Sequence, residues 1–215
     1  ALGGADLVAK ISDLTDRADG VLYTSDGRDV EMSVASTKAF YAQVAAGFLL
    51  AFAIADELTG ESSEDRETIL HALRELPTAM EQVLARRVPI GEIAHRLAPA
   101  RRYWAVVGNG SNRIAAHEVR IKLSELCYKS IACDGTEDKK HIDLSSEPLI
   151  LVCAAGLTGT TADDVAKEAA IFRAHKATPI VIATEGEERF SAAAQAIKVP
   201  AIHPPLAFVL STLAG

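Results

Sequence analysis

A lysine, a carboxylate and an imidazole with the spacing of a proton-transfer site lie between positions 122 and 141. Lys122 and Glu125 are three residues apart in a segment with a helical pattern, so they project as neighbours from one side of the helix. His141 follows sixteen residues after Glu125, within a run of charged residues. These groups can move protons on a carbonyl compound such as an open-chain sugar. A surface ion pair and a solvated loop histidine are the plain alternatives.

A glycine-containing turn precedes this helix. Residues 108–111 (Gly-Asn-Gly-Ser) follow an expected strand, Tyr103–Val107, and lead into a helix predicted from about Arg113 to Tyr128. Backbone N–H groups at a helix start attract anions, so Gly110 and Ser111 are candidate ligand-binding residues. A dinucleotide fingerprint would need a third glycine where Arg113 stands, which makes that interpretation weak. A simple strand-to-helix turn explains the glycines equally well.

The apolar spacing predicts which side of this helix is buried. Ile114, His117 and Ile121, together with residues 123–126, would form one buried face, with His117 as a core histidine. The charged run at 137–140 predicts an exposed surface.

The second half of the chain alternates short apolar runs with helical patterns. Such alternation predicts parallel βαβ units with right-handed crossovers. We therefore expect an α/β three-layer sandwich with a doubly wound parallel sheet, plus an additional helical block over residues 38–97. Ligands of such sheets bind at the carboxyl ends of the strands, where residues 108–111, 134–141 and 154–160 would gather. The expected strands are Tyr103–Val107, Lys129–Cys133, Leu149–Cys153, Pro179–Ala183 and Ala196–Val199, and the helices between them Arg113–Cys127, Thr161–His175 and Phe190–Gln195.

The first half of the chain has helical patterns only. A long helix is expected over Lys38–Leu58, followed by helices at 63–75, 80–86 and 89–97, with a break at Pro77. The uncharged run Val44–Ala55 has twelve residues, whereas a membrane span needs about 18. We therefore predict a buried core helix and no association with a membrane.

Composition excludes several classes of protein. The chain has 215 residues, 49% of them hydrophobic and 24% charged, as in ordinary globular domains. A net charge of −7 without a basic stripe argues against nucleic-acid binding. The cysteines, Cys127, Cys133 and Cys153, have neither zinc spacing nor an even number, which predicts free buried thiols in the cytoplasm. We expect no metal and no cofactor.

The segment Glu31–Phe40 (EMSVASTKAF) resembles a stretch of the glutamine–fructose-6-phosphate aminotransferases, which carry two sugar isomerase (SIS) domains. In that family the stretch closes the first SIS domain. The helical block, the Gly-x-Gly turn, the Lys-x-x-Glu helix and the Lys-His pair then follow in the order found in the second SIS domain. The resemblance extends from about Asp16 to the end of the chain.

The resemblance implies a role for each site residue. Glu125 would be the base that moves a proton between the first two carbons of the sugar, and Lys122 would position the substrate and keep Glu125 ionised. His141 would open the sugar ring, often from across a dimer interface. Val34 and Ser36 would touch the sugar. The implied substrate is fructose 6-phosphate, converted to glucosamine 6-phosphate by a homodimer.

The sequence also departs from the family. The Gly-Glu-Leu-Lys-His-Gly-Pro loop is replaced by Glu137–Asp143 (EDKKHID), which must adopt another conformation. The family's phosphate-binding loop, C-terminal lysine tail and glutaminase domain have no counterpart in these residues. We expect residues 1–60 to be the end of a first SIS domain, 61–100 connecting helices, and 101–215 a second SIS domain incomplete at its C-terminus, as in a piece of a longer protein.

Two further functions remain open at this point. The same fold could serve as a non-catalytic sugar-phosphate sensor in which Glu125 is dispensable. A dinucleotide-dependent oxidoreductase is the remaining alternative, based on the Gly-x-Gly turn and on Asp134 after the second strand.

Overall fold

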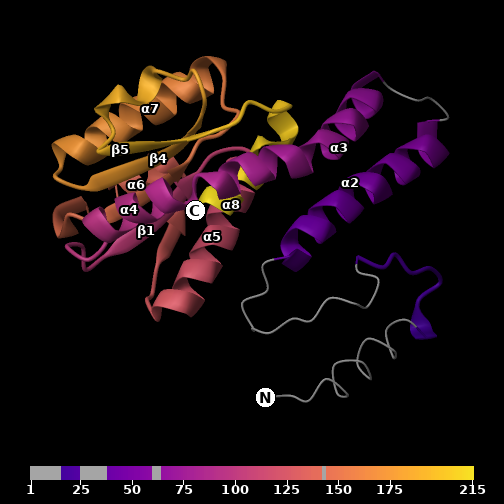
Figure 1. Cartoon of the computed structure of the whole chain (residues 1–215), viewed down its shortest axis with the longest axis horizontal. Helices are drawn as coiled ribbons and strands as arrows, with labels where there is room; N and C mark the ends of the chain where they lie inside the picture. Colours follow the sequence, from indigo (N-terminus) through magenta and orange to yellow (C-terminus); the bar gives the residue numbers. More distant parts are fainter. Residues whose placement is uncertain (1–15, 25–37, 60–63, 142–143) are drawn as a thin grey trace. The chain divides into compact units, whose positions relative to one another are not determined.

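The computed structural model describes residues 16–24, 38–59, 64–141 and 144–215. The chain divides into two compact units, residues 1–61 and residues 62–215. The first unit contributes the long helix α2 (Lys38–Thr59), and the second holds the sheet and all the remaining helices described here (Figure 1).

A five-stranded, all-parallel sheet forms the centre of the second unit, as predicted. Its strand order is β2-β1-β3-β4-β5, so β2 and β3 lie on opposite sides of β1. The observed strands begin and end within about three residues of the expected positions. They are β1 (Trp104–Gly108), β2 (Ala132–Asp134), β3 (Leu149–Cys153), β4 (Thr178–Thr184) and β5 (Gln195–Val199).

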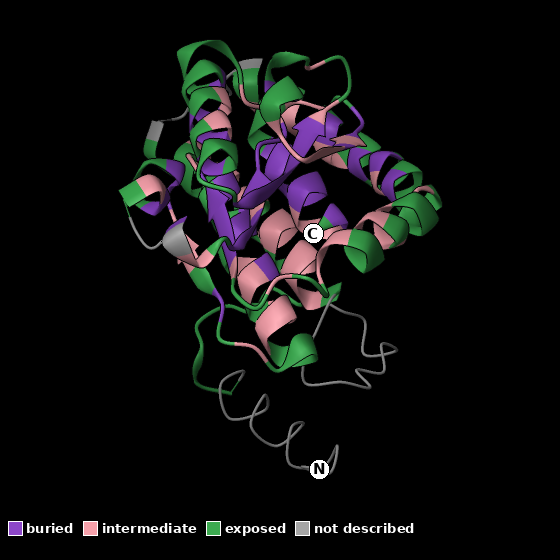
Figure 2. Ribbon diagram, turned by 90° about the vertical axis from the view of Figure 1, so that its left-hand side faces the viewer, coloured by how far each residue is buried: buried purple, intermediate pink, exposed green. Residues whose placement is uncertain are grey.

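Helices cover both faces of this sheet, which confirms the three-layer sandwich. Alternate strand residues point to opposite faces: Val107 and Val152 pack with α7 (Gly159–Ala174), whereas Val106 and Leu151 face the other layer. That other layer contains α4 (Arg87–Leu97), α5 (Asn112–Cys127) and α8 (Ala207–Ala214). The short helix α6 (Thr136–His141) packs against α7. Figure 2 shows the buried residues concentrated in the strands and the helix faces beside them.

The core on the α7 side explains why this helix forms. Val165, Ala169 and Phe172 recur at helical spacing, and each is at most 1% exposed. Burying a side chain as large as Phe172 stabilises the fold by about 1.5–3 kcal/mol.

The predicted buried face of α5 is wrong. Ile114 is 51% exposed and His117 lies at the surface, whereas Ala115, Ala116 and Val119 are buried. The helix packs against the sheet and α8 through these small residues, because alanine allows a close approach of helix and strand.

Two helix predictions in the second unit also need correction. α3 (Glu64–Ala85) passes through Pro77 without a break, because Leu76, Ala79 and Val83 are buried on one face and α3 packs against α8. This packing offsets the hydrogen bond that proline removes. The helix expected at 190–195 is a single 3₁₀ turn, Arg189–Ala192, since the chain re-enters the sheet at Gln195.

The expectation that α2 is a buried core helix is not met. None of its described side chains is buried. Residues Lys38–Leu58 are long and apolar enough to cross a membrane by length and composition alone. This apolar helical segment is therefore longer than the twelve-residue run, Val44–Ala55, on which the prediction was based.

Candidate functional site

The carboxyl edge of the sheet gathers the three segments that the sequence places there. The side-chain amide of Asn109, after β1, donates to the Thr136 hydroxyl at 2.7 Å, and its oxygen accepts the Thr136 N–H at 3.2 Å. Asn112 donates to the carbonyl of Ala155 at 2.8 Å and accepts from the Ser211 hydroxyl at 2.7 Å. The loops after β1, β2 and β3 are thus joined by buried or half-buried hydrogen bonds.

Gly110 and Ser111 form the turn between β1 and α5. Gly110 has φ +56°, a conformation that favours glycine. The carbonyls of Gly110 and Ser111 accept the N–H groups of Arg113 and Ile114 at 3.1 and 3.0 Å. Ser111 precedes α5 without capping it through its side chain.

Lys122 and Glu125 do meet on α5, with a third residue that the sequence did not single out. The Lys122 ammonium lies 3.8 Å from Glu125 Oε2 and 3.3 Å from Glu118 Oε1. Lys122 and Glu118 are largely covered, with side chains 22% and 17% exposed, and Glu125 is 39% exposed. Glu118 stands four residues before Lys122, a spacing that could have identified it from the sequence.

This ion-paired group does not lie at the carboxyl edge. α5 begins at the tip of β1 and runs back along the sheet to the start of β2. At about 1.5 Å per residue, Glu125 lies roughly 20 Å along the helix from Asn112. The prediction of one crevice shared by Lys122, Glu125 and the strand tips is therefore wrong for this unit. The strand tips lie at the start of α5, whereas Lys122 and Glu125 lie near its end.

His141 ends α6 instead of lying in a loop. Asn109 Oδ1 accepts the first N–H of α6, and Glu137 and Asp138 near the start with Lys139 and Lys140 near the end match the helix dipole. His141 is 69% exposed, and its Nε2 lies 3.5 Å from Glu137 Oε1. The predicted exposure of residues 137–140 fails at Lys139, which is 5% exposed.

Lys140 connects α6 to a buried carboxyl group on α7. Its ammonium lies 2.7 Å from Glu137 Oε2 and 3.1 Å from Glu168 Oε1. The hydrogen bond from Lys140 lowers the pKa of Glu137 to about 2. Burial, followed by the nearby Glu137 carboxyl, raises the pKa of Glu168. Sequence reasoning missed Glu168, because a glutamate within a helical pattern is normally exposed.

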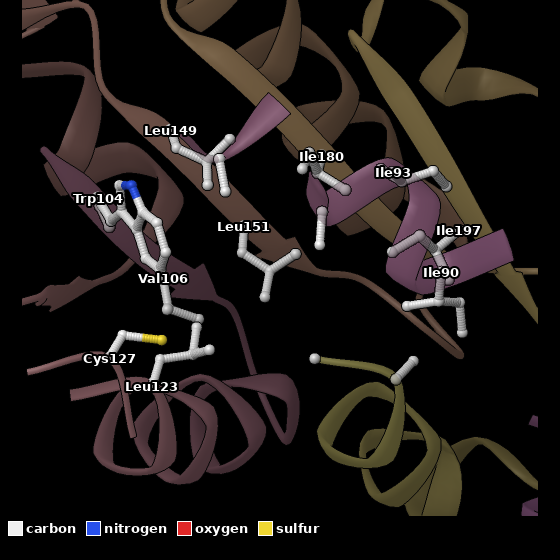
Figure 3. Close-up of a pocket in the computed structure, with 15 residues that line it drawn as sticks. Ile90, Ile93, Trp104, Val106, Leu123, Cys127, Leu149, Leu151, Ile180 and Ile197 are labelled. Atoms are coloured by element: carbon white, nitrogen blue, oxygen red, sulfur yellow. The ribbon is translucent and has the colours of Figure 1, made fainter. Parts of the chain in front are cut away.

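Two cavities are associated with these helices. An apolar cavity of about 200 Å³ lies between the sheet and α4, α5 and α8; Figure 3 shows Trp104, Leu151 and Ile180 from the strands facing Leu123 of α5 and Ile90 of α4. A polar cleft of about 410 Å³ lies between α6 and α7. Neither cavity is lined by Lys122 or Glu125.

The remaining expected site features concern metal binding, the three cysteines and the two residues expected to touch the sugar. Within the described residues no group of three or more His, Cys, Asp or Glu side chains is arranged to hold a metal ion. Cys153 is buried, Cys133 is half-buried and Cys127 is exposed, so the prediction of three buried thiols is wrong for Cys127. Val34 and Ser36 lie outside the described residues.

Comparison with known proteins identifies relatives of this chain. No family model matches it. Over 208 residues, 95% of this chain, the sequence is 33% identical to a glutamine–fructose-6-phosphate aminotransferase (isomerizing) of Thermus thermophilus. The chain spans only 34% of that relative's length.

Solved structures show the same fold. The C-terminal domain of glucosamine-fructose-6-phosphate aminotransferase from Francisella tularensis matches with a TM-score of 0.76 and 20% identity, over 86% of this chain and 53% of that one. The Vibrio vulnificus NanR protein, complexed with ManNAc-6P, matches with a TM-score of 0.52 and 12% identity, over 78% of this chain and 62% of that one. The chain is therefore homologous to the glutamine–fructose-6-phosphate aminotransferases over about a third of their length, with the sugar isomerase fold of their C-terminal part.

Proposed function

We propose that this chain is the phosphosugar-binding isomerase part of an aminotransferase that converts fructose 6-phosphate to glucosamine 6-phosphate. The observation that carries the proposal is the 33% identity to an isomerizing aminotransferase across 95% of the chain. Lys122 and Glu125 add a chemically suitable pair at positions that match the Lys-x-x-Glu motif.

Each residue has a role that its chemistry can perform. Glu125 takes a proton from C1, the carbon next to the C2 carbonyl, and returns it to C2, as aldose–ketose exchange requires. Lys122, 3.8 Å away, pairs with that carboxylate and contacts sugar hydroxyls. His141 transfers a proton at the ring oxygen. Val34 and Ser36, from the first half of the chain, contact the substrate. Gly110 and Ser111 lie at the other end of α5, roughly 20 Å from Glu125, and are not part of this proposed site.

The proposal includes a homodimer in the cytoplasm. Within one copy, α5 and α6 belong to the layers on opposite faces of the sheet. A second copy would therefore supply His141 to the site that contains Glu125. The free thiols support a reducing compartment. Residues 1–60 and 101–215 are proposed as parts of two successive SIS domains.

The test is substitution of the proposed base. Glu125→Gln keeps the size of the side chain but removes the basic carboxylate, so formation of glucosamine 6-phosphate from fructose 6-phosphate and ammonium should fall by about 10²–10⁴-fold. The rise in melting temperature on adding fructose 6-phosphate should persist, because binding does not need the base. Glu92→Gln, on the exposed surface of α4, is the control that retains turnover.

A second candidate is a non-catalytic sensor of sugar phosphates. It is supported by the shared fold with NanR, which was solved with ManNAc-6P. In that case fructose 6-phosphate raises the melting temperature, but neither the unsubstituted chain nor Glu125→Gln turns it over. Loss of both binding and turnover in Glu125→Gln would instead assign Glu125 a structural role.

A further inference from the structure

The polar cleft between α6 and α7 lies where parallel sheets of this kind bind ligands. Asn109 lines it from the tip of β1, and Thr136 lines it from just beyond β2. At β1 the strand order reverses, since β2 and β3 lie on its two sides. A crevice outside the carboxyl ends of strands at such a reversal is the usual ligand site of doubly wound folds. The Lys122–Glu125 pair lies elsewhere, on α5.

Glu168 forms the floor of this cleft. It is 6% exposed, whereas the side chains of Glu137 and Lys167 at the rim are 66% and 74% exposed. Its Oε1 accepts a hydrogen bond from Lys140, but its buried Oε2 has no hydrogen-bond partner among the residues that the structure describes. Buried polar atoms without partners are rare and call for an explanation, which a functional site provides.

The charges in the cleft indicate what kind of molecule fits. Lys140 is already paired with Glu137 and Glu168, and Lys167 lies 3.3 Å from Asp164. A phosphate would therefore meet paired lysines and three carboxyl groups. A hydroxyl group both donates and accepts, so it can bond to the Glu137 carboxylate, to the remaining ammonium hydrogen of Lys140 and to the Thr136 hydroxyl.

We infer that the α6–α7 cleft binds a small neutral polyol, such as an unphosphorylated sugar, through hydroxyl contacts with Glu137, Lys140 and Thr136 above Glu168. Within one copy this site is separate from the Lys122–Glu125 pair, although Glu137 also contacts His141, and the binding of a polyol here does not require turnover. Its volume of about 410 Å³ falls within the usual range for small-molecule pockets.

Fructose and fructose 6-phosphate are the matched probes, because they differ only in the phosphate. In NMR titrations of the whole chain, fructose should shift the backbone amide signals of Asn109, Thr136 and Lys140 in a saturable way. Fructose 6-phosphate should bind at these residues with an affinity about fivefold lower or weaker still, since the phosphate adds repulsion. Absence of a saturable shift at these residues, or tighter binding of the phosphate there, would overturn the inference.

Substitutions then assign the contacts. Glu137→Gln alters an exposed side chain and should lower the affinity for fructose about fivefold, roughly the value of one hydrogen bond. Glu168→Gln should lower it similarly if the variant folds, which its amide spectrum will show. Glu92→Gln on α4 is the matched control with unchanged affinity. Fructose binding that survives Glu137→Gln, or that is lost in Glu125→Gln, would contradict the assigned site.

Discussion

At the residue scale, the turn before α5 depends on two glycines for different reasons. A Cβ atom on Gly108 would lie 2.3 Å from the carbonyl oxygen of Asn112, so no side chain fits between β1 and the first turn of α5. Gly110 has open space around it but a φ of +56°. Glycine is needed at 108 because β1 and α5 pack closely there, and at 110 because the backbone adopts a left-handed conformation.

These two roles predict different costs for the same substitution. Gly108→Ala must displace the start of α5 and should lower the free energy of unfolding by about 3 kcal/mol, at the upper end for overpacking. Gly110→Ala should lower it by about 1 kcal/mol, the cost of a left-handed conformation for a residue with Cβ. Urea denaturation of both variants measures the difference. Equal losses would show that steric conflict at Gly108 is not the deciding factor.

At the element scale, α6 owes its position to the contacts of Lys140. This six-residue helix is too short to be stable alone. Lys140 joins Glu137 on α6 to Glu168 on α7, and Thr136 bonds with Asn109 after β1. The position of His141, at the end of α6, follows from these contacts.

Because its pKa is lowered, the Glu137 carboxylate should make the stability of the fold depend on pH. Lys140 lowers the pKa of Glu137 from 4.5 to about 2 in the folded protein. The folded state therefore gains stability from this group above pH 4.5, and loses that contribution as the pH falls from 4.5 to 2. Glu137→Gln removes the titrating group, so its melting temperature should fall less over this interval than that of the unsubstituted chain. Calorimetric scans across the interval, with Glu92→Gln as control, provide the measurement; parallel curves for Glu137→Gln and the unsubstituted chain would argue against the Lys140 contact.

At the scale of the whole molecule, the hydrophobic core belongs to the second unit. The described buried apolar residues lie between Ala72 and Ala214, and none belongs to the first unit. A layer of helices on each face of the sheet is the arrangement that buries both sides of parallel strands.

The second unit should therefore fold by itself. A chain of residues 62–215 should unfold in one cooperative transition followed by circular dichroism, with a midpoint close to that of the main transition of the full chain. Gradual, non-cooperative loss of helix in this fragment would mean that residues 1–61 supply essential packing.

The sequence by itself determined the elements and their order. Apolar runs of five or so residues alternating with helical patterns are local signals. They correctly predicted the parallel sheet and the helices α5 and α7 between its strands, and the helical spacing predicted the meeting of Lys122 with Glu125. It also predicted which loops meet at the carboxyl edge, because parallel strands fix that edge wherever the side chains point.

The tertiary structure decided which surfaces those elements use. α5 packs through Ala115, Ala116 and Val119 instead of its isoleucines, and it carries Glu125 away from the strand tips. Lys140 meets Glu168 across 28 positions in the sequence. Such contacts depend on how two helices pack against one sheet, and the periodicity within either helix contains no information about its neighbour.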